Sequence, residues 1–228
     1  MTESRKTFHQ QLDAIKKELV RLGALVLEAI PRGTDALLLN DLAAIEEIIQ
    51  DDDAIDRLST ALEEHCYSVL ALQQPMARDL REIVTGIRMS SEIERSGDLV
   101  VNICKGARRI YGQELDPRLR GIIGRMSERA QQLYRFAIDA YVEGDAPLAA
   151  ALHDMDDVLD QLQKDFIAAI FDAHGAGRID LQVAIQLALI ARFYERIGDH
   201  AVNIGERVRY MVTGALPEPN HPLGSAPA

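Results

Sequence analysis

Several residue types are scarce or missing in this 228-residue sequence: it has no tryptophan, only two cysteines, and aromatic residues make up 5%. Cys66 and Cys104 are too few for a disulfide framework, so we expect a reducing compartment and two small core side chains. The most apolar run, at 183–191, is too short to cross a membrane, and the charged N-terminus does not resemble a signal peptide. We therefore expect a soluble, cytoplasmic protein without membrane insertion.

Positive charge is also in short supply, because 25 lysines and arginines face 36 aspartates and glutamates, for a net charge of -11. This balance argues against a general binder of nucleic acid or anionic membranes and is compatible with binding cations. The sequence has no P-loop, no dinucleotide-binding glycine motif after a strand, and no arrangement of nucleophile, histidine and acid. It also lacks the His-x-x-x-His and Cys-x-x-Cys spacings of zinc enzymes. These absences favour a protein that is not an enzyme.

Helix-forming residues dominate the sequence, and apolar residues recur at helical spacing, as at Leu12, Ile15 and Leu19. No stretch alternates as a strand would. The sequence therefore predicts an all-α protein with six long helices. Their expected ranges are 4–39, 42–72, 77–111, 118–143, 146–173 and 179–212. Within the first, Pro31 predicts a kink or local break, and the true turn is expected at Asn40–Asp41.

An internal repeat organises the chain. "IERSGDLVVNICK" (93–105) and "YERIGDHAVNIGE" (194–206) share a Glu-Arg-x-Gly-Asp-x-x-Val-Asn-Ile pattern, and 40–58 aligns with 144–162. The second half is three residues shorter between these segments, which predicts a shorter connection there. Asp41 and Asp145 are predicted helix N-caps. We expect two tandem three-helix-bundle repeats related by pseudo-symmetry, at 5–112 and 113–213, followed by a disordered tail at 214–228.

The last helix of each half carries two carboxylates one turn apart on the stripe that should pack inward. The same stripe holds Gly97 and Gly198, each of which costs about 1 kcal/mol relative to alanine inside a helix. A small residue there implies close approach of another helix or a ligand. The middle helices add two more acidic pairs. The predicted site residues are Asp52, Asp56, Glu94, Asp98, Asp156, Asp160, Glu195 and Asp199.

Converging carboxylates repel one another, so they require cations or must take up protons. Oxygen ligands without cysteine or histidine suit Mg²⁺, Mn²⁺, Ca²⁺ or iron best. The competing interpretation is a solvated helix face in which the acids pair with arginines such as Arg95 and Arg196. The duplication does not decide between them, because a copied salt bridge would also appear twice.

Other polar residues lie close to these pairs. His200 follows Asp199 and aligns with Leu99, which favours a surface histidine over one that supports a metal ligand. Asn102 and Asn203, one turn beyond each aspartate, are interpreted as amides that pack between helices or support ligands. The basic group Lys105, Arg108 and Arg109 is expected on a solvated face near a helix C-terminus.

Two three-helix units with this acidic pattern resemble the phosphate-uptake regulator family, PhoU. Residues 73–103 are similar to the family's first repeat and 187–206 to its second, and the resemblance covers roughly residues 5–212. One departure is Ser96, which stands where the second repeat has Ile197 and the family usually has an apolar residue.

This resemblance implies a cytoplasmic, all-helical, often dimeric protein that acts as a negative regulator of phosphate uptake and of the phosphate-starvation response. Such a protein links the ATPase subunit of the phosphate ABC transporter to a membrane sensor histidine kinase, which places it peripherally at the inner membrane through its partners. It also implies metal ions (Fe, Mn, Mg or Zn) held by the eight carboxylates named above.

Two other interpretations remain. A ferritin-like carboxylate di-iron or metal-storage protein ranks lower, because such bundles use Glu-x-x-His pairs and no acidic pair here has a histidine three residues on. A helical scaffold without metal, whose carboxylates only form salt bridges, differs from the regulator in mechanism more than in role.

Overall fold

The computed structural model describes residues 3–215, with side chains from residue 6 onward, and within this range it contains helices and no strand. The predicted all-α fold is confirmed, and every predicted helix end lies within two residues of the observed one. The helices are α1 (Glu3–Leu39), α2 (Leu42–Gln73), α3 (Ala77–Arg109), α4 (Pro117–Glu143), α5 (Ala146–Gly175) and α6 (Leu181–Thr213). The predicted disordered tail lies, from residue 216 onward, outside the described residues.

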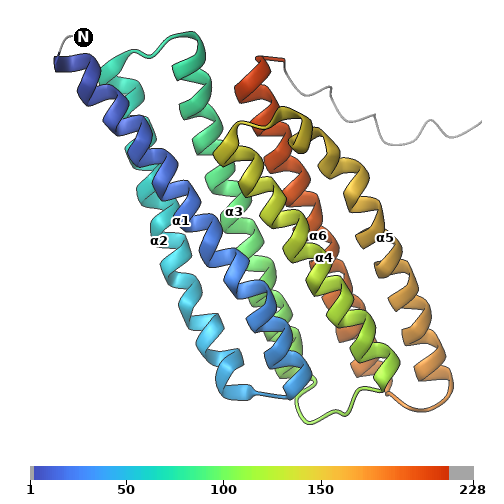
Figure 1. Ribbon diagram of the computed structural model, residues 1–228. Coiled ribbons are helices and arrows are strands. Elements are labelled where there is room, and N and C mark those ends of the chain that lie inside the picture. Colours follow the sequence, from blue (N-terminus) through green and yellow to red (C-terminus); the bar gives the residue numbers. More distant parts are fainter. Residues whose placement is uncertain (1–2, 216–228) are drawn as a thin grey trace, which may run out of the picture.

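The six helices run alongside one another, with α1–α3 forming one half and α4–α6 the other (Figure 1). The halves meet where α3 packs against α6 and α1 packs against α4. Buried side chains from both halves form one continuous hydrophobic cluster, which includes the predicted core cysteines Cys66 and Cys104. None of the described helices has the length and apolarity needed to cross a membrane.

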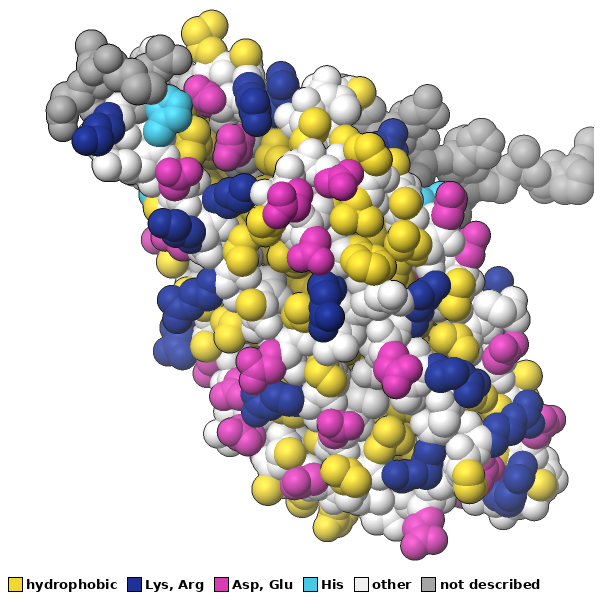
Figure 2. All heavy atoms as spheres, in the orientation of Figure 1, with side chains coloured by type: hydrophobic (Ala, Val, Ile, Leu, Met, Phe, Trp, Pro, Cys, Tyr) yellow, Lys and Arg dark blue, Asp and Glu magenta, His cyan; other side chains and the backbone are white. Residues whose placement is uncertain are grey.

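Charged side chains of both signs are intermixed over the face shown in Figure 2. Apolar side chains are exposed between them on that face. The largest exposed apolar side chains of the described chain include Met76, Leu39, Leu72 and Phe171, each at least 71% exposed. They lie at or near helix ends, so the two ends of the bundle carry much of the exposed apolar surface.

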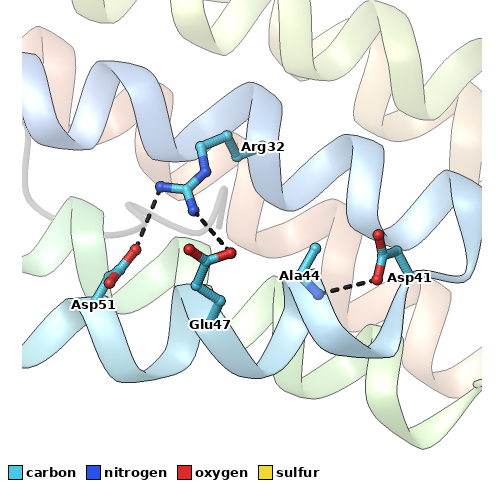
Figure 3. A network of polar contacts seen from close by, with 5 residues as sticks. All are labelled: Arg32, Asp41, Ala44, Glu47 and Asp51. Atoms are coloured by element: carbon cyan, nitrogen blue, oxygen red, sulfur yellow. Dashed lines mark hydrogen bonds and ion pairs between the residues drawn. The ribbon is translucent and has the colours of Figure 1, made fainter.

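Matching turns begin the middle helix of each half, as predicted. The Asp41 carboxylate accepts a hydrogen bond from the Ala44 N–H at 3.0 Å (Figure 3), and Asp145 accepts one from Leu148 at 2.8 Å. The preceding residues, Asn40 and Gly144, both have left-handed backbone conformations, with φ of 52° and 65°. Asparagine and glycine tolerate that conformation best, which explains their place in these tight turns.

Of the kink or local break predicted at Pro31, the break is wrong, because α1 continues without interruption through this residue to Leu39. Proline removes one backbone hydrogen bond inside a helix. Here the surrounding turns are held by tertiary packing, since Val26 and Ile30 are both buried at 0–1% exposure. The uninterrupted helix matches the interior position of Arg135, the repeat counterpart of Pro31, in α4.

The predicted shorter connection in the second half is also wrong. The linker between α5 and α6 spans 176–180, whereas 74–76 joins α2 to α3. The missing length lies in the helices, because α5 has 30 residues against 32 in α2, and α6 begins 14 residues before Glu195 whereas α3 begins 17 residues before Glu94. In addition, Asp180 caps α6 from outside, while its counterpart Asp79 lies inside the first turn of α3.

Candidate functional site

The eight predicted carboxylates form two groups. The first carboxylate group comprises Asp52 and Asp56 of α2 with Glu94 and Asp98 of α3. The second comprises Asp156 and Asp160 of α5 with Glu195 and Asp199 of α6. In each group the two helices pack against each other, and each helix contributes residues four positions apart, which lie on one face. The acidic pairs of each half therefore lie on neighbouring helices.

Each member of the first carboxylate group lies within electrostatic range of others. Burial, together with the charges of Asp56, Asp98 and Glu94 and opposed by Lys105, raises the pKa of Asp52 to about 6. Burial likewise raises the pKa of Glu94, with added repulsion from Asp98 and Asp56. A buried carboxylate beside like charges favours its neutral form. The first group therefore holds negative charge at a cost in free energy.

Repulsion is similar in the second carboxylate group. Burial raises the pKa of Asp156 to about 7, assisted by the charges of Asp160, Asp199 and Glu195. Burial also raises the pKa of Glu195, with Asp199 raising it further and Arg192 opposing the rise. The strongest shift thus falls on the α5 residue that faces the α6 pair.

Gly97 and Gly198, which occupy equivalent positions in the two halves, leave room for these side chains. A Cβ on Gly198 would lie 2.7 Å from Leu159 Cδ2 and closer still to Asp156 Oδ1. A Cβ on Gly97 would lie 3.4 Å from Asp52 Oδ1. Close approach of the neighbouring helix, predicted from the sequence, is therefore observed in both halves. It is tighter at Gly198, where a side chain would overlap the Asp156 carboxylate.

The donor atoms available to an ion are all carboxylate oxygens, which suits hard cations. Two of them, Asp156 Oδ1 and Glu195 Oε2, are buried without a hydrogen-bond partner among the described residues. Orphaned buried acceptors of this kind fit a site that a cation or a proton would complete. Within residues 3–215, however, no three acidic, histidine or cysteine side chains are arranged around a common point as ligands. The structure thus assembles the donors without showing a coordination sphere.

The salt-bridge interpretation accounts for only one of these carboxylates. Arg192 pairs with Glu195 on the same helix, and in the described part of the chain this is the only ion pair made by either group. Arg95 and Arg196, the arginines considered from the sequence, are exposed. Most of the acidic charge is therefore left without a direct basic partner.

The prediction that His200 lies on the surface is wrong. Its side chain is 8% exposed, and its Nδ1 lies 2.6 Å from Glu92 Oε2 across the interface between α3 and α6. Asn203 donates a hydrogen bond to the same oxygen at 3.2 Å, which confirms its interpretation as a packing amide. Burial alone would raise the pKa of Glu92, but the hydrogen bonds from His200 and Asn203 and the charge of Arg207 lower it below its ordinary value.

Glu92 was missed because it belongs to no repeated motif. Its counterpart in the second half is Phe193, just as the counterpart of His200 is Leu99. The sequence did carry one signal, since α3 and α6 each have a polar residue where the other half has an apolar one; the structure shows that the two helices pack together. Ser96 also departs from its counterpart, and its hydroxyl donates to the Glu92 carbonyl oxygen at 2.8 Å, so its burial leaves no donor unpaired.

The basic group near the end of α3 behaves largely as predicted. Arg108 and Arg109 are exposed, and Arg108 donates to Glu46 Oε1 at 2.9 Å. Lys105 is half-buried and faces the first carboxylate group closely enough to oppose the rise in the pKa of Asp52.

Known proteins resemble this chain along nearly its whole length. The chain is 37% identical over 214 residues to phosphate-specific transport system accessory protein PhoU homolog 1 of Mycobacterium tuberculosis, covering 93% of this chain and 96% of the relative. It is 30% identical over 207 residues to PhoU homolog 1 of Thermotoga maritima, covering 91% and 89%.

Solved structures agree with these relatives. The phosphate transport system regulatory protein PhoU from Streptococcus pneumoniae superposes with a TM-score of 0.85 at 26% identity, over 92% of this chain and 99% of that one. PhoU from Pseudomonas aeruginosa gives 0.85 at 27% identity, over 91% and 100%.

The PhoU domain model matches twice, at residues 19–107 and 123–208. Each match spans one acidic pair from the middle helix and one from the last helix of its half. The repeat seen in the sequence therefore corresponds to two copies of one known domain, and the chain belongs to the PhoU family.

Proposed function

We propose that this protein is an accessory component of a phosphate-specific transport system that acts as a negative regulator of phosphate uptake and of the phosphate-starvation response. The supporting observation is full-length similarity to relatives named as phosphate-specific transport system accessory proteins, with both domain copies present. The protein acts as an adaptor without catalysis. Its partners are the ATPase subunit of the phosphate ABC transporter and a membrane sensor histidine kinase, and it forms a homodimer.

Bound metal belongs to this proposal. The two carboxylate groups would hold iron, manganese, magnesium or zinc ions, which neutralise repelling negative charge when bound. The support is the carboxylate-only donor set, the pKa values of Asp52 and Asp156 raised to about 6 and 7, and the orphaned oxygens of Asp156 and Glu195. The two carboxylate groups lie on the packed pairs α2–α3 and α5–α6, so metal occupancy would set the charge of these helix pairs.

The regulatory role is tested by deleting the gene in its native host and measuring a phosphate-starvation reporter at high phosphate. We expect the deletion strain to keep the reporter active, and plasmid-borne wild-type protein to restore repression. Normal repression in the deletion strain would overturn the assignment. Elemental analysis of the purified protein and calorimetric titration with Mn²⁺ test the metal sites separately. A protein that binds no metal would remove the metal proposal and leave the result of the deletion experiment unaffected.

A further inference from the structure

A cavity of about 250 Å³ lies between α1, α2 and α3. Its walls are mostly apolar, with Leu25 and Ala29 from α1, Ile48 and Ile55 from α2, and Val100 from α3. The cavity opens to solvent between charged side chains. Its volume is comparable to that of one large apolar side chain, and such pockets at the centre of an interface bind the anchor residues of partner proteins.

In the second half, larger or more apolar side chains stand at the positions equivalent to three residues that line the cavity. Ala29 aligns with Leu133, which is buried at 1% exposure. Arg32 aligns with Phe136 and Asp51 with Met155, and both of these apolar side chains pack against the core. The small and charged residues that line the cavity thus belong to the first half and are not repeated in the second.

The mouth of the cavity is acidic. Arg32 reaches from α1 across to α2, where it pairs with Glu47 at 3.6 Å and Asp51 at 3.4 Å (Figure 3). Its positive charge is therefore already balanced. Glu28 and Asp52 also line the cavity, and Asp52 adjoins the rest of the first carboxylate group. Lys105 offsets part of the charge on Asp52, so the rim as a whole remains negative.

We propose that this cavity is an anchor site for a partner protein, which inserts one large apolar side chain flanked by lysine or arginine. The apolar walls fit the anchor residue, and the acidic rim, including the exposed Glu47 and Asp51, fits the flanking basic groups. This inference rests on the proposed adaptor function and adds to it the place and the chemistry of one partner contact.

The test uses the full-length protein with isotope-labelled isoleucine methyl groups, after removal of metal with a chelator. The probe is a synthetic pentapeptide with one phenylalanine between two pairs of lysines. We expect saturable shifts of the Ile48 and Ile55 methyl resonances, with a dissociation constant on the order of 1 mM for so small a ligand. A peptide with alanine in place of phenylalanine, and one with glutamates in place of lysines, should each bind at least about fivefold more weakly.

Ala29→Leu copies the second half's Leu133 into the cavity and should weaken binding of the lysine–phenylalanine peptide at least about tenfold. Ala24→Leu makes the same change at an exposed position of the same helix and should leave binding unchanged. Glu28→Gln removes charge from the rim without changing shape, and should weaken binding two- to fivefold. This variant keeps the test decisive if Ala29→Leu fails to fold.

The proposal is overturned if the alanine peptide shifts both methyls as strongly, or if a folded Ala29→Leu variant binds the probe unchanged. Equal affinity for phenethylammonium, a free amine, would assign the cavity to small molecules and remove the partner protein. These outcomes are separate from the deletion experiment. If the deletion strain loses repression while Ala29→Leu restores it fully and no peptide binds, the regulatory role stands and only the anchor site fails.

Discussion

At Gly198 the Asp156 carboxylate approaches the backbone of α6 so closely that a methyl group would overlap it. We predict that Gly198→Ala lowers the free energy of unfolding by about 1–3 kcal/mol, because overpacking outweighs the gain in helix propensity. Gly97→Ala is the matched control in the other half. Its Cβ would meet Ile55 and Asp52 at 3.3–3.4 Å, so we expect a change of at most about 1 kcal/mol in either direction. Urea denaturation measures both, and equal effects would contradict the asymmetry.

The raised pKa values of Asp52 and Asp156 predict a pH dependence of the metal-free protein. An aspartate in the unfolded chain has a pKa of about 3.9, whereas burial raises these pKa values to about 6 and about 7. The folded state therefore keeps protons that the unfolded state releases. The resulting stabilisation is complete below about pH 4 and is lost as the pH rises through 6 and 7.

Asp52→Asn and Asp156→Asn should therefore each stabilise the metal-free protein by roughly 1 kcal/mol at pH 8, and change it little at pH 4. Urea denaturation at the two pH values gives the comparison, with the exposed Asp139→Asn as control. A gain of the same size at both pH values would rule out relief of charge repulsion. Added Mn²⁺ should stabilise only proteins whose carboxylate groups are intact.

The positions of the eight carboxylates were predictable because the repeat presents each acidic pair twice, at a spacing that fixes its helix face. The buried pair of Glu92 and His200 was not, since it exists once and joins residues far apart in the chain. Helical periodicity describes a residue's own helix, and it does not say which neighbouring helix covers that face. His200 was predicted to lie on the surface because it aligns with Leu99 and is therefore not part of the repeated motif.

Between elements, α3 and α6 are joined by several polar contacts, and the contact of Glu92 with His200 and Asn203 is one of them. Glu92→Ala would leave the buried His200 and Asn203 without their shared acceptor, so we predict a loss of about 2–4 kcal/mol in unfolding free energy. The exposed pair of Arg118 and Asp172 provides the control, because both side chains are at least 58% exposed. Asp172→Ala should change stability by less than about 0.5 kcal/mol. Comparable losses of unfolding free energy in the two variants would show that burial does not make the Glu92 contact more important for stability than an exposed ion pair.

The positions of the helices were largely predictable from the sequence. The long amphipathic periodicity indicates the buried face of each helix, and capping aspartates indicate where a helix begins. The exceptions have a common cause. Sequence alignment of the halves records a difference of three residues but not whether a helix or a linker absorbs it. Here the two-residue loss in α5 is offset by a linker two residues longer, and α6 begins three residues closer to its acidic motif than α3 does. At Pro31, local propensity predicts a break, and the buried turns on either side hold α1 continuous.

Across the whole molecule, two copies of one domain share the same scaffold and differ at particular positions. The acidic pairs and the small glycines are duplicated. The cavity residue Ala29, its rim residue Arg32 and the buried His200 are not. Differences placed on a shared scaffold therefore make the two halves of this pseudo-symmetric protein unlike each other.

The continuous core predicts that the halves unfold together. Buried residues of both halves belong to one cluster, and the halves meet through α3 with α6 and through α1 with α4. Leu133→Ala, a cavity mutation in α4, should cost about 2–5 kcal/mol and keep a single urea transition. Hydrogen exchange should show α2 and α5 losing protection by similar free energies, although α2 does not pack against α4. Two separate transitions, or an α2 whose exchange is unchanged, would mean that each repeat folds on its own core and that the interface between α3 and α6 forms only afterwards.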